Sequence, residues 1–246
     1  MTEWSSWQKH LCELGHYLGE RGLAWGTSGN ISLRVDEERF LISASGAWLG
    51  KLTPEQTALC SLHDDAVSGA KPSVETPMHR AIYRTRPEAQ VVVHVSPPYS
   101  TLVACSSLEV PTDLNIENIF YLGSIARVPY IQPGTQQLAE AVAEAVREHE
   151  TIILSNHGVI TFHRSIPEVL MRVESFEMSC RLIVMARMAA LMQSPEFPAL
   201  LDWLERDDIV KRFSKTHPHV YDHLRALREM TTPSMPALRV RAVADQ

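Results

Sequence analysis

Hydrophobic residues recur along the chain at two different spacings, and the alternation between them predicts helices interleaved with strands. Apolar residues spaced three or four apart are typical of amphipathic helices. Capping residues and prolines mark where further helices begin. Helices are therefore expected at 1–24, from about Ser73 onward, from the prolines of PPYSTLVACSS, at 136–149 and at 166–192.

Short apolar or alternating runs predict the strands. The clearest is AQVVVHV at 89–95, whose apolar density suits a strand covered on both faces. The other runs lie at 31–35, 39–45, 127–131, 151–156 and 159–163, with a further strand inside 54–70. Strands in the middle of the chain with helices around them predict one layered α/β domain over residues 1–230, followed by a C-terminal tail at 231–246.

The composition excludes several classes of protein. The 246 residues include 45% hydrophobic and 21% charged residues, which is typical of a globular chain rather than a disordered one. With 23 basic and 29 acidic side chains the net charge is -6, and no basic cluster favours nucleic acid or a membrane surface as partner. Neither a signal peptide nor a membrane span is expected, and four scattered cysteines predict no disulfide framework. These features indicate a cytoplasmic protein.

Three short segments have the composition of an anion-binding site. GTSGN at 26–30 combines glycines with hydroxyl groups, SASG at 43–46 has the same character, and Ser73 is expected at a helix N-terminus. Backbone N–H groups and hydroxyls in such segments can surround a phosphate. Each segment could equally be an ordinary turn.

Two pairs of titratable residues are candidates for chemistry. Glu75 and His79 are four residues apart, on one face of the predicted helix, where a partly dry carboxylate could act as a general acid or base. The alternative is an exposed helical pair. His94 and His157 each follow an apolar strand, and imidazoles at strand ends suit a divalent metal. The alternative for each is a buried, hydrogen-bonded histidine.

Taken in order, these segments resemble the class II aldolase/adducin family. The resemblance covers residues 8–192 and rests on GTSGNIS, SASG, KLTPE, KPSVETPMHRAIYRTRPEAQVVVHV, VPYIQPGTQQLAE and SNHGVI. It implies a three-layer α/β/α domain with a central, mostly antiparallel sheet, and a homotetramer with sites between subunits. The family includes sugar-phosphate aldolases, epimerases, a dehydratase, decarboxylases and the non-enzymatic adducin heads.

The resemblance also implies a role for each candidate residue. Glu75 matches the family's general acid/base, and His94 and His157 match two of its three metal-binding histidines. A divalent metal, zinc first and iron, manganese, cobalt or nickel as alternatives, would act as a Lewis acid on a substrate that passes through an enediolate. The residues that match the family's substrate-phosphate pocket are Thr27, Ser28, Gly29, Asn30, Ser45, Gly46 and Ser73.

One metal-binding position departs from the family pattern. The family usually has His-x-His on this strand, but the second histidine is replaced by Ser96, and a serine hydroxyl is a poor ligand beside imidazoles. Three outcomes follow: a set of two histidines and Glu75, recruitment of His79 or His163, or loss of the metal. The family's catalytic tyrosine has no clear counterpart, and Tyr121 is the candidate.

The leading functional hypothesis is a metal-dependent lyase, or a related epimerase, dehydratase or decarboxylase, acting on a small phosphorylated sugar or sugar acid. Two alternatives remain open. The first is a non-catalytic, adducin-like binding or scaffold protein. The second is an Fe(II)-dependent oxygenase on the same fold, because two histidines and a carboxylate are typical ligands of non-haem iron.

Overall fold

The computed structural model describes residues 4–191, and their helices and strands alternate as the hydrophobic pattern predicts. The helices are α1 (Ser5–Glu20), α2 (Thr76–Thr85), α3 (Pro98–Ala104), α4 (Gln136–Ala145) and α5 (Ile166–Leu191). The strands are β1 (Asn30–Arg34), β2 (Arg39–Ser43), β3 (Thr57–Ser61), β4 (Val67–Gly69), β5 (Val91–Val95), β6 (Ile125–Val128), β7 (Thr151–Leu154) and β8 (Gly158–His163). Short 3-10 turns at Leu49–Lys51 (η1) and Pro54–Gln56 (η2) and a π-helical turn at Asn118–Leu122 (η3) complete this part.

The eight strands form one sheet in the order β4-β3-β2-β1-β5-β8-β7-β6. Every neighbouring pair is antiparallel except β6 and β7, which are parallel. The central, mostly antiparallel sheet is therefore confirmed.

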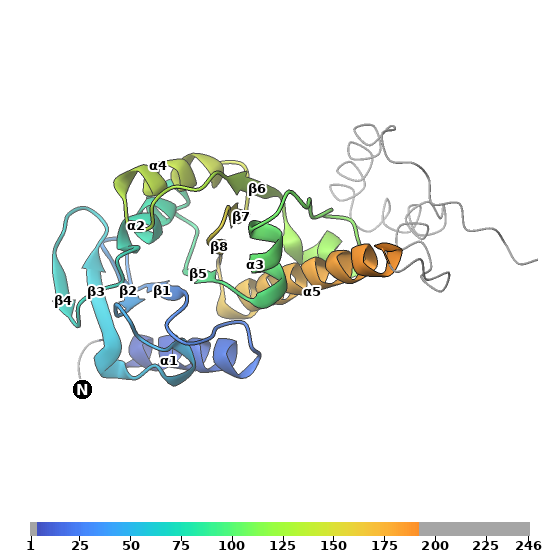
Figure 1. Ribbon diagram of the computed structural model, residues 1–246. Coiled ribbons are helices and arrows are strands. Elements are labelled where there is room, and N and C mark those ends of the chain that lie inside the picture. The colour runs from blue at the N-terminus through green and yellow to red at the C-terminus, as the bar shows by residue number, and fades with distance from the viewer. Residues whose placement is uncertain (1–3, 192–246) are drawn as a thin grey trace, which may run out of the picture.

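Helices cover both faces of the sheet, as Figure 1 shows, with α2 and α4 on one side and α1, α3 and α5 on the other. Alternate residues of β5 divide between the two cores. Val91, Val93 and Val95 pack with α1 and α5, whereas Val92 faces α2 and α4. The three-layer α/β/α architecture is confirmed. The boundary at residue 230 stays a prediction, and the tail at 231–246 lies outside the described residues.

Two local predictions need correction. The segment 54–70 holds two strands, β3 and β4, which pair with each other across a turn. The second helix begins at Thr76 rather than near Ser73, because Ser73 forms a turn: its hydroxyl accepts the N–H of Glu75 and its carbonyl accepts the N–H of Thr76. Glu75 is consequently the residue before the helix, and both Glu75 and His79 are buried rather than exposed.

The strand directions bring distant residues to one edge of the sheet, which we call the site edge. Since β5 and β7 are both antiparallel to β8, they are parallel to each other and their carboxyl ends meet there. The amino end of β1 joins them, because Asn30 pairs with His94. The turn between β7 and β8 carries His157 to the same edge.

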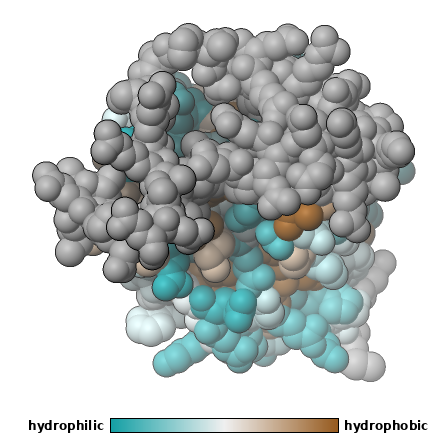
Figure 2. Space-filling model, turned by 90° about the vertical axis from the view of Figure 1, so that its right-hand side faces the viewer, coloured by the Kyte–Doolittle hydropathy of each residue, from teal (hydrophilic) through white to brown (hydrophobic). Residues whose placement is uncertain are grey.

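The described surface has the mixed character usual for a globular protein. On the face in Figure 2, hydrophilic groups predominate among the described residues, with smaller hydrophobic areas between them. Among the helices within residues 4–191, none has the length and apolar character needed to cross a membrane.

Candidate metal centre

Glu75, His94 and His157 converge at the site edge, as a shared metal site would require of these side chains. Their ligand atoms all lie within 4.8 Å of one another. Nε2 of His94 is 3.2 Å from Nε2 of His157 and 3.2 Å from Oε2 of Glu75. Nε2 of His157 is 3.4 Å from Oε1 of Glu75. The three side chains come from β5, the β7–β8 turn and the residue before α2.

His94 is held with one ring nitrogen turned toward this cluster. Its Nδ1 donates to the carbonyl oxygen of Val159 at 3.0 Å, which leaves Nε2 to face the other two side chains. Burial lowers the pKa of His94, but the charge and hydrogen bond of Glu75 outweigh burial and raise it. The field of Glu75 thus favours a positive charge at this point, whether a proton or a metal ion.

Glu75 is only 5% exposed, and one of its oxygens lacks a hydrogen-bond partner. Oε2 accepts the amide Nδ2 of Asn30 at 2.8 Å, whereas buried Oε1 has no hydrogen bond within residues 4–191. Burial alone would raise the pKa of Glu75, but His94 and His157 overcome it and hold that pKa well below the usual range. Glu75 therefore brings a negative charge and an open oxygen to the cluster.

The spacing fits a small cation. Ligands about 2.0–2.1 Å from a tetrahedral zinc ion lie about 3.3–3.4 Å from one another. Nε2 of His94 and Nε2 of His157 lie 3.2 Å apart, close to that value, whereas the contacts of 3.2 and 3.4 Å to Glu75 involve its two different oxygens. Burial lowers the pKa of His157 to about 4, with the charge of His94 adding to the effect and Glu75 opposing it. A neutral His157 imidazole is the form that binds metals. The donor set thus fits a divalent ion with one coordination position open.

Neither proposed substitute supplies a third histidine. Both ring nitrogens of His79 are already bonded, Nδ1 with Ser32 Oγ at 2.7 Å and Nε2 with Asn30 Oδ1 at 2.6 Å. His163 pairs with Val91 at the opposite end of β5, and its Nδ1 lies 2.8 Å from Glu168 Oε2. Recruitment of His79 or His163 as ligand is therefore wrong.

Ser96 uses its hydroxyl elsewhere in the site. Its Oγ donates to the main-chain carbonyl of His157 at 3.0 Å. A Cβ added to Gly158 would lie 2.6 Å from this oxygen, so the serine packs directly on the turn that carries His157. Ser96 supports the backbone of one ligand residue rather than acting as a ligand.

The glycine- and hydroxyl-rich segments gather beside the cluster. A bridge joins Ala44 to Pro72, and the N–H of Ser73 donates to Ser43 O, so the second segment lies against Ser73. The first segment, residues 26–30, leads into β1, which pairs with β5. Oγ of Ser28 is buried and has no hydrogen-bond partner within residues 4–191. The sheet thus brings together the segments of Thr27, Ser28, Gly29, Asn30, Ser45, Gly46 and Ser73.

Gly29 has a specific structural requirement. Its φ is +86°, and an added Cβ would lie 2.5 Å from the carbonyl oxygen of His94. Glycine alone adopts this backbone without strain, and its missing side chain allows β1 to approach β5. Gly29 therefore fixes the position of Asn30 opposite His94.

Some contacts of the site were not predicted. Asn30 was expected in the phosphate pocket, but its side chain contacts Glu75 and His79. Trp25 donates from its indole N–H to the carbonyl of Ser96 at 2.9 Å, directly after β5. Tyr121 lies in η3, which packs against α5, and its side chain is 40% exposed.

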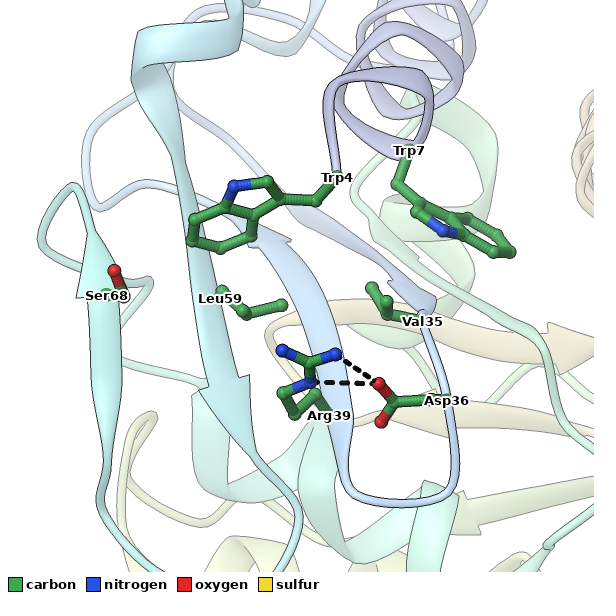
Figure 3. Close-up of a pocket in the computed structure, with 7 residues that line it drawn as sticks. All are labelled: Trp4, Trp7, Val35, Asp36, Arg39, Leu59 and Ser68. Atoms are coloured by element: carbon green, nitrogen blue, oxygen red, sulfur yellow. Dashed lines mark hydrogen bonds and ion pairs between the residues drawn. The ribbon is translucent and has the colours of Figure 1, made fainter. Parts of the chain in front are cut away.

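A hollow of about 630 Å³ lies elsewhere, beneath the start of α1 (Figure 3). Trp4 and Trp7 stand over it, and Arg39 Nε and Nη2 both donate to Asp36 Oδ2, at 2.8 and 2.6 Å. The β1–β2 hairpin forms its floor, at the end of β1 opposite Asn30. None of the predicted site residues lines it.

Comparison with known proteins defines the family. Residues 9–184 match the family model for the Class II Aldolase and Adducin N-terminal domain. The chain therefore belongs to the class II aldolase and adducin family, and a metal-dependent, lyase-type function fits that membership.

Individual relatives and structures agree with this assignment. The 3-oxo-tetronate 4-phosphate decarboxylase of Escherichia coli K12 is 29% identical over 182 residues, which cover 72% of this chain and 86% of the relative. The methylthioribulose-1-phosphate dehydratase of Methylococcus capsulatus is 32% identical over 190 residues, covering 72% and 92%. The crystal structure of L-fuculose-1-phosphate aldolase from Thermus thermophilus is similar with a TM-score of 0.67 and 29% identity, over 78% of this chain and 97% of that one.

Proposed function

We propose that this protein is a metal-dependent lyase for a small phosphorylated sugar or sugar acid. The observation that carries the proposal is the convergence of two imidazoles and a buried carboxylate, one oxygen of which accepts no hydrogen bond. His94, His157 and Glu75 are the proposed ligands, and zinc is the proposed ion because the 3.2 Å separation of the two imidazole nitrogens suits tetrahedral ligands. Bound there, the metal would supply a Lewis acid for negative charge that develops on substrate oxygens.

Glu75 is also the proposed acid/base. This role rests on the match of Glu75 to the family's general acid/base; His94 and His157 lower its pKa, so it is ionised near neutral pH but is a weak proton acceptor in the metal-free site. Oε1 faces His157 and the metal position, whereas Oε2 accepts from Asn30 and lies 3.2 Å from Nε2 of His94. The surrounding burial excludes water from the carboxylate.

The neighbouring segments are the proposed phosphate pocket. Their contribution is hydroxyl groups such as Oγ of Ser28, which is buried and has no hydrogen-bond partner within residues 4–191. Relatives that act on 3-oxo-tetronate 4-phosphate and methylthioribulose 1-phosphate support a phosphorylated substrate. The proposed contacts are those of Thr27, Ser28, Gly29, Asn30, Ser45, Gly46 and Ser73.

A homotetramer is the proposed assembly. Loops around the site edge present four large hydrophobic side chains, Trp25, Trp48, Val74 and Tyr130, that are 51–62% exposed. Such a concentration of apolar groups is typical of an interface. Light scattering on the purified protein tests the assembly, and a monomer would contradict it. The proposed compartment is the cytoplasm, in keeping with four free cysteines.

The experiment for the reaction combines metal analysis with turnover. After removal of metal and reconstitution with zinc, we expect about one equivalent per chain and metal-dependent cleavage of a ketose phosphate or a phosphorylated sugar acid. The matched variant His94→Ala should lose both metal and turnover. Failure of the unsubstituted protein to bind zinc, iron, manganese, cobalt or nickel would contradict the proposal and favour a scaffold.

The set of two histidines and one carboxylate also favours a second candidate, an Fe(II)-dependent oxygenase. Oxygen uptake that requires Fe(II) and disappears in Glu75→Ala would support that candidate. Cleavage under anaerobic conditions would support the lyase.

A further inference from the structure

A chain of buried polar side chains leads away from the metal centre into the interior beneath α2. It runs from Glu75 through Asn30, His79 and Ser32 to Tyr83, and each of these residues is less than a tenth exposed. The successive contacts measure 2.8, 2.6, 2.7 and 2.8 Å. A buried polar chain of this length must be hydrogen-bonded throughout, because an unpaired member would cost about 1–3 kcal/mol.

The chemistry of each group fixes the direction of the first two bonds. An ionised carboxylate only accepts hydrogen bonds, so Asn30 presents its amide Nδ2 to Glu75 Oε2. The carboxamide oxygen of Asn30 is then turned to His79. Since an amide oxygen only accepts, Nε2 of His79 carries the hydrogen and donates it to Asn30 Oδ1.

The remaining bonds follow from the neutrality of His79. Its side chain is 0% exposed, and both of its hydrogen-bond partners, Ser32 and Asn30, are uncharged, so nothing in contact with the ring favours a charged form. A neutral ring with hydrogen on Nε2 accepts at Nδ1, so the hydroxyl of Ser32 donates to it. That hydroxyl has one hydrogen, and Tyr83 therefore donates to Ser32. Every donor in the chain points toward Glu75.

We propose that His79 is a positioning residue that acts through Asn30 on the metal-binding carboxylate. By accepting from Nε2 of His79, the Asn30 carboxamide is held in the orientation in which its NH2 group binds Glu75 Oε2. Glu75 then keeps Oε1 open toward His157 and the metal position. This inference rests on the proposed function, since it assigns His79 a part in the same metal site. Partners that orient metal ligands typically contribute about 10–100-fold in metal affinity.

The reversed arrangement shows what His79 prevents. A carboxamide rotated by half a turn would place its oxygen against the Glu75 carboxylate, and two acceptors in contact repel each other. Glu75 would then turn away from Asn30, and Oε1 would no longer be the unpaired atom. The hydrogen on Nε2 of His79 excludes the rotated carboxamide, because this hydrogen requires an acceptor, and only the oxygen of the Asn30 side chain can accept it.

The first test uses the metal-free protein and needs no activity. Long-range proton–nitrogen correlation spectra of ¹⁵N-labelled protein distinguish the two neutral tautomers of histidine from the charged ring. We expect His79 to be neutral with its hydrogen on Nε2 near neutral pH. A ring whose only hydrogen is on Nδ1 would overturn the inference, because it could not donate to Asn30 Oδ1.

The second test compares two amide substitutions at the same position. The amide of His79→Gln reaches the place of Nε2 and can still donate to Asn30, whereas the shorter His79→Asn reaches only the place of Nδ1. In competition with a chromophoric chelator, we expect zinc affinity to fall about 10–100-fold in His79→Asn and less than about threefold in His79→Gln. Equal affinities in both variants, or losses that follow only their melting temperatures, would overturn the inference.

The two tests separate this inference from the proposed function. Zinc binding by the unsubstituted protein tests the proposed function alone. The tautomer of His79 decides the direction of the hydrogen-bond chain whether or not metal binds. If His79→Asn does not fold, the tautomer in the unsubstituted protein still supports or overturns the inference.

Discussion

Gly29→Ala tests whether close contact between β1 and β5 positions the metal centre. The substitution has two costs in the structure. The backbone φ of +86° strains an alanine, and the new Cβ would lie 2.5 Å from the carbonyl oxygen of His94. Gly22→Ala is the matched control, since Gly22 has a φ of +70° but nothing within 4 Å of an added Cβ. The control has the backbone strain without the contact.

The expected magnitudes follow from these two costs. A left-handed backbone costs an alanine about 1–2 kcal/mol, which both variants should lose. Relief of the contact with His94 should cost Gly29→Ala about 1–3 kcal/mol more, as in other overpacked sites. For a chain of this size the additional loss corresponds to a melting temperature about 2–12 °C below that of Gly22→Ala.

Urea unfolding followed by circular dichroism measures the difference in free energy of unfolding, and a zinc titration measures its effect on the site. Since β1 can relieve the contact only by moving away from His94, Asn30 moves as well, and zinc affinity should fall at least about tenfold in Gly29→Ala. Gly22→Ala should bind zinc normally. Equal stabilities of the two variants, or unchanged zinc affinity in Gly29→Ala, would show that this contact does not position the site.

Two further substitutions and one labelling reaction test other parts of the structure. Glu177→Ala should lower the free energy of unfolding by about 2 kcal/mol in thermal denaturation, because Glu177 accepts two main-chain N–H groups and the Ser100 hydroxyl at the start of α3; an unchanged melting temperature would contradict this. Ser96→Ala should keep about one zinc per chain, since its hydroxyl bonds the His157 carbonyl; loss of zinc would make Ser96 a ligand. Near pH 8, iodoacetamide should modify exposed Cys105 first by mass spectrometry. The other three thiols belong to Cys12, Cys60 and Cys180, and burial raises their pKa to about 11, 11 and 12, respectively. Labelling of any of them as fast as that of Cys105 would contradict the structure.

The residues of the metal centre could be selected from the sequence because each carries a strong local signal. His94 lies at the end of one apolar strand and His157 follows another, which favoured a metal site as a pair, although a buried histidine was the alternative for each. Their convergence could not be derived from periodicity, since it depends on β8 pairing with both β5 and β7. The resemblance to a known family supplied that arrangement, and the strand directions now explain it.

Glu75 and His79 show where local reasoning fails. Helical spacing placed them together on one face, with exposure as the alternative. The helix begins one residue after Glu75, so the carboxylate turns to the site edge while His79 enters the interior. The turn at Ser73 decides this start, and such side-chain hydrogen bonds compete with helix formation in a way that periodicity does not reveal.

Asn30 and Ser32 were within reach of sequence reasoning. They alternate with Ile31 and Leu33 in a strand, so period-2 geometry places both polar side chains on one face. Two polar groups on the buried face of a central strand require partners. Which partners they find depends on the helix packed above them, and this packing is a tertiary property of the fold.

Anomalous diffraction at the zinc edge, from crystals of the zinc-reconstituted protein, would show the metal centre directly. We expect one strong peak about 2.0–2.2 Å from Nε2 of His94, Nε2 of His157 and a carboxylate oxygen of Glu75. A reconstituted crystal with no peak there, or with zinc bound by other residues, would contradict the proposed metal centre.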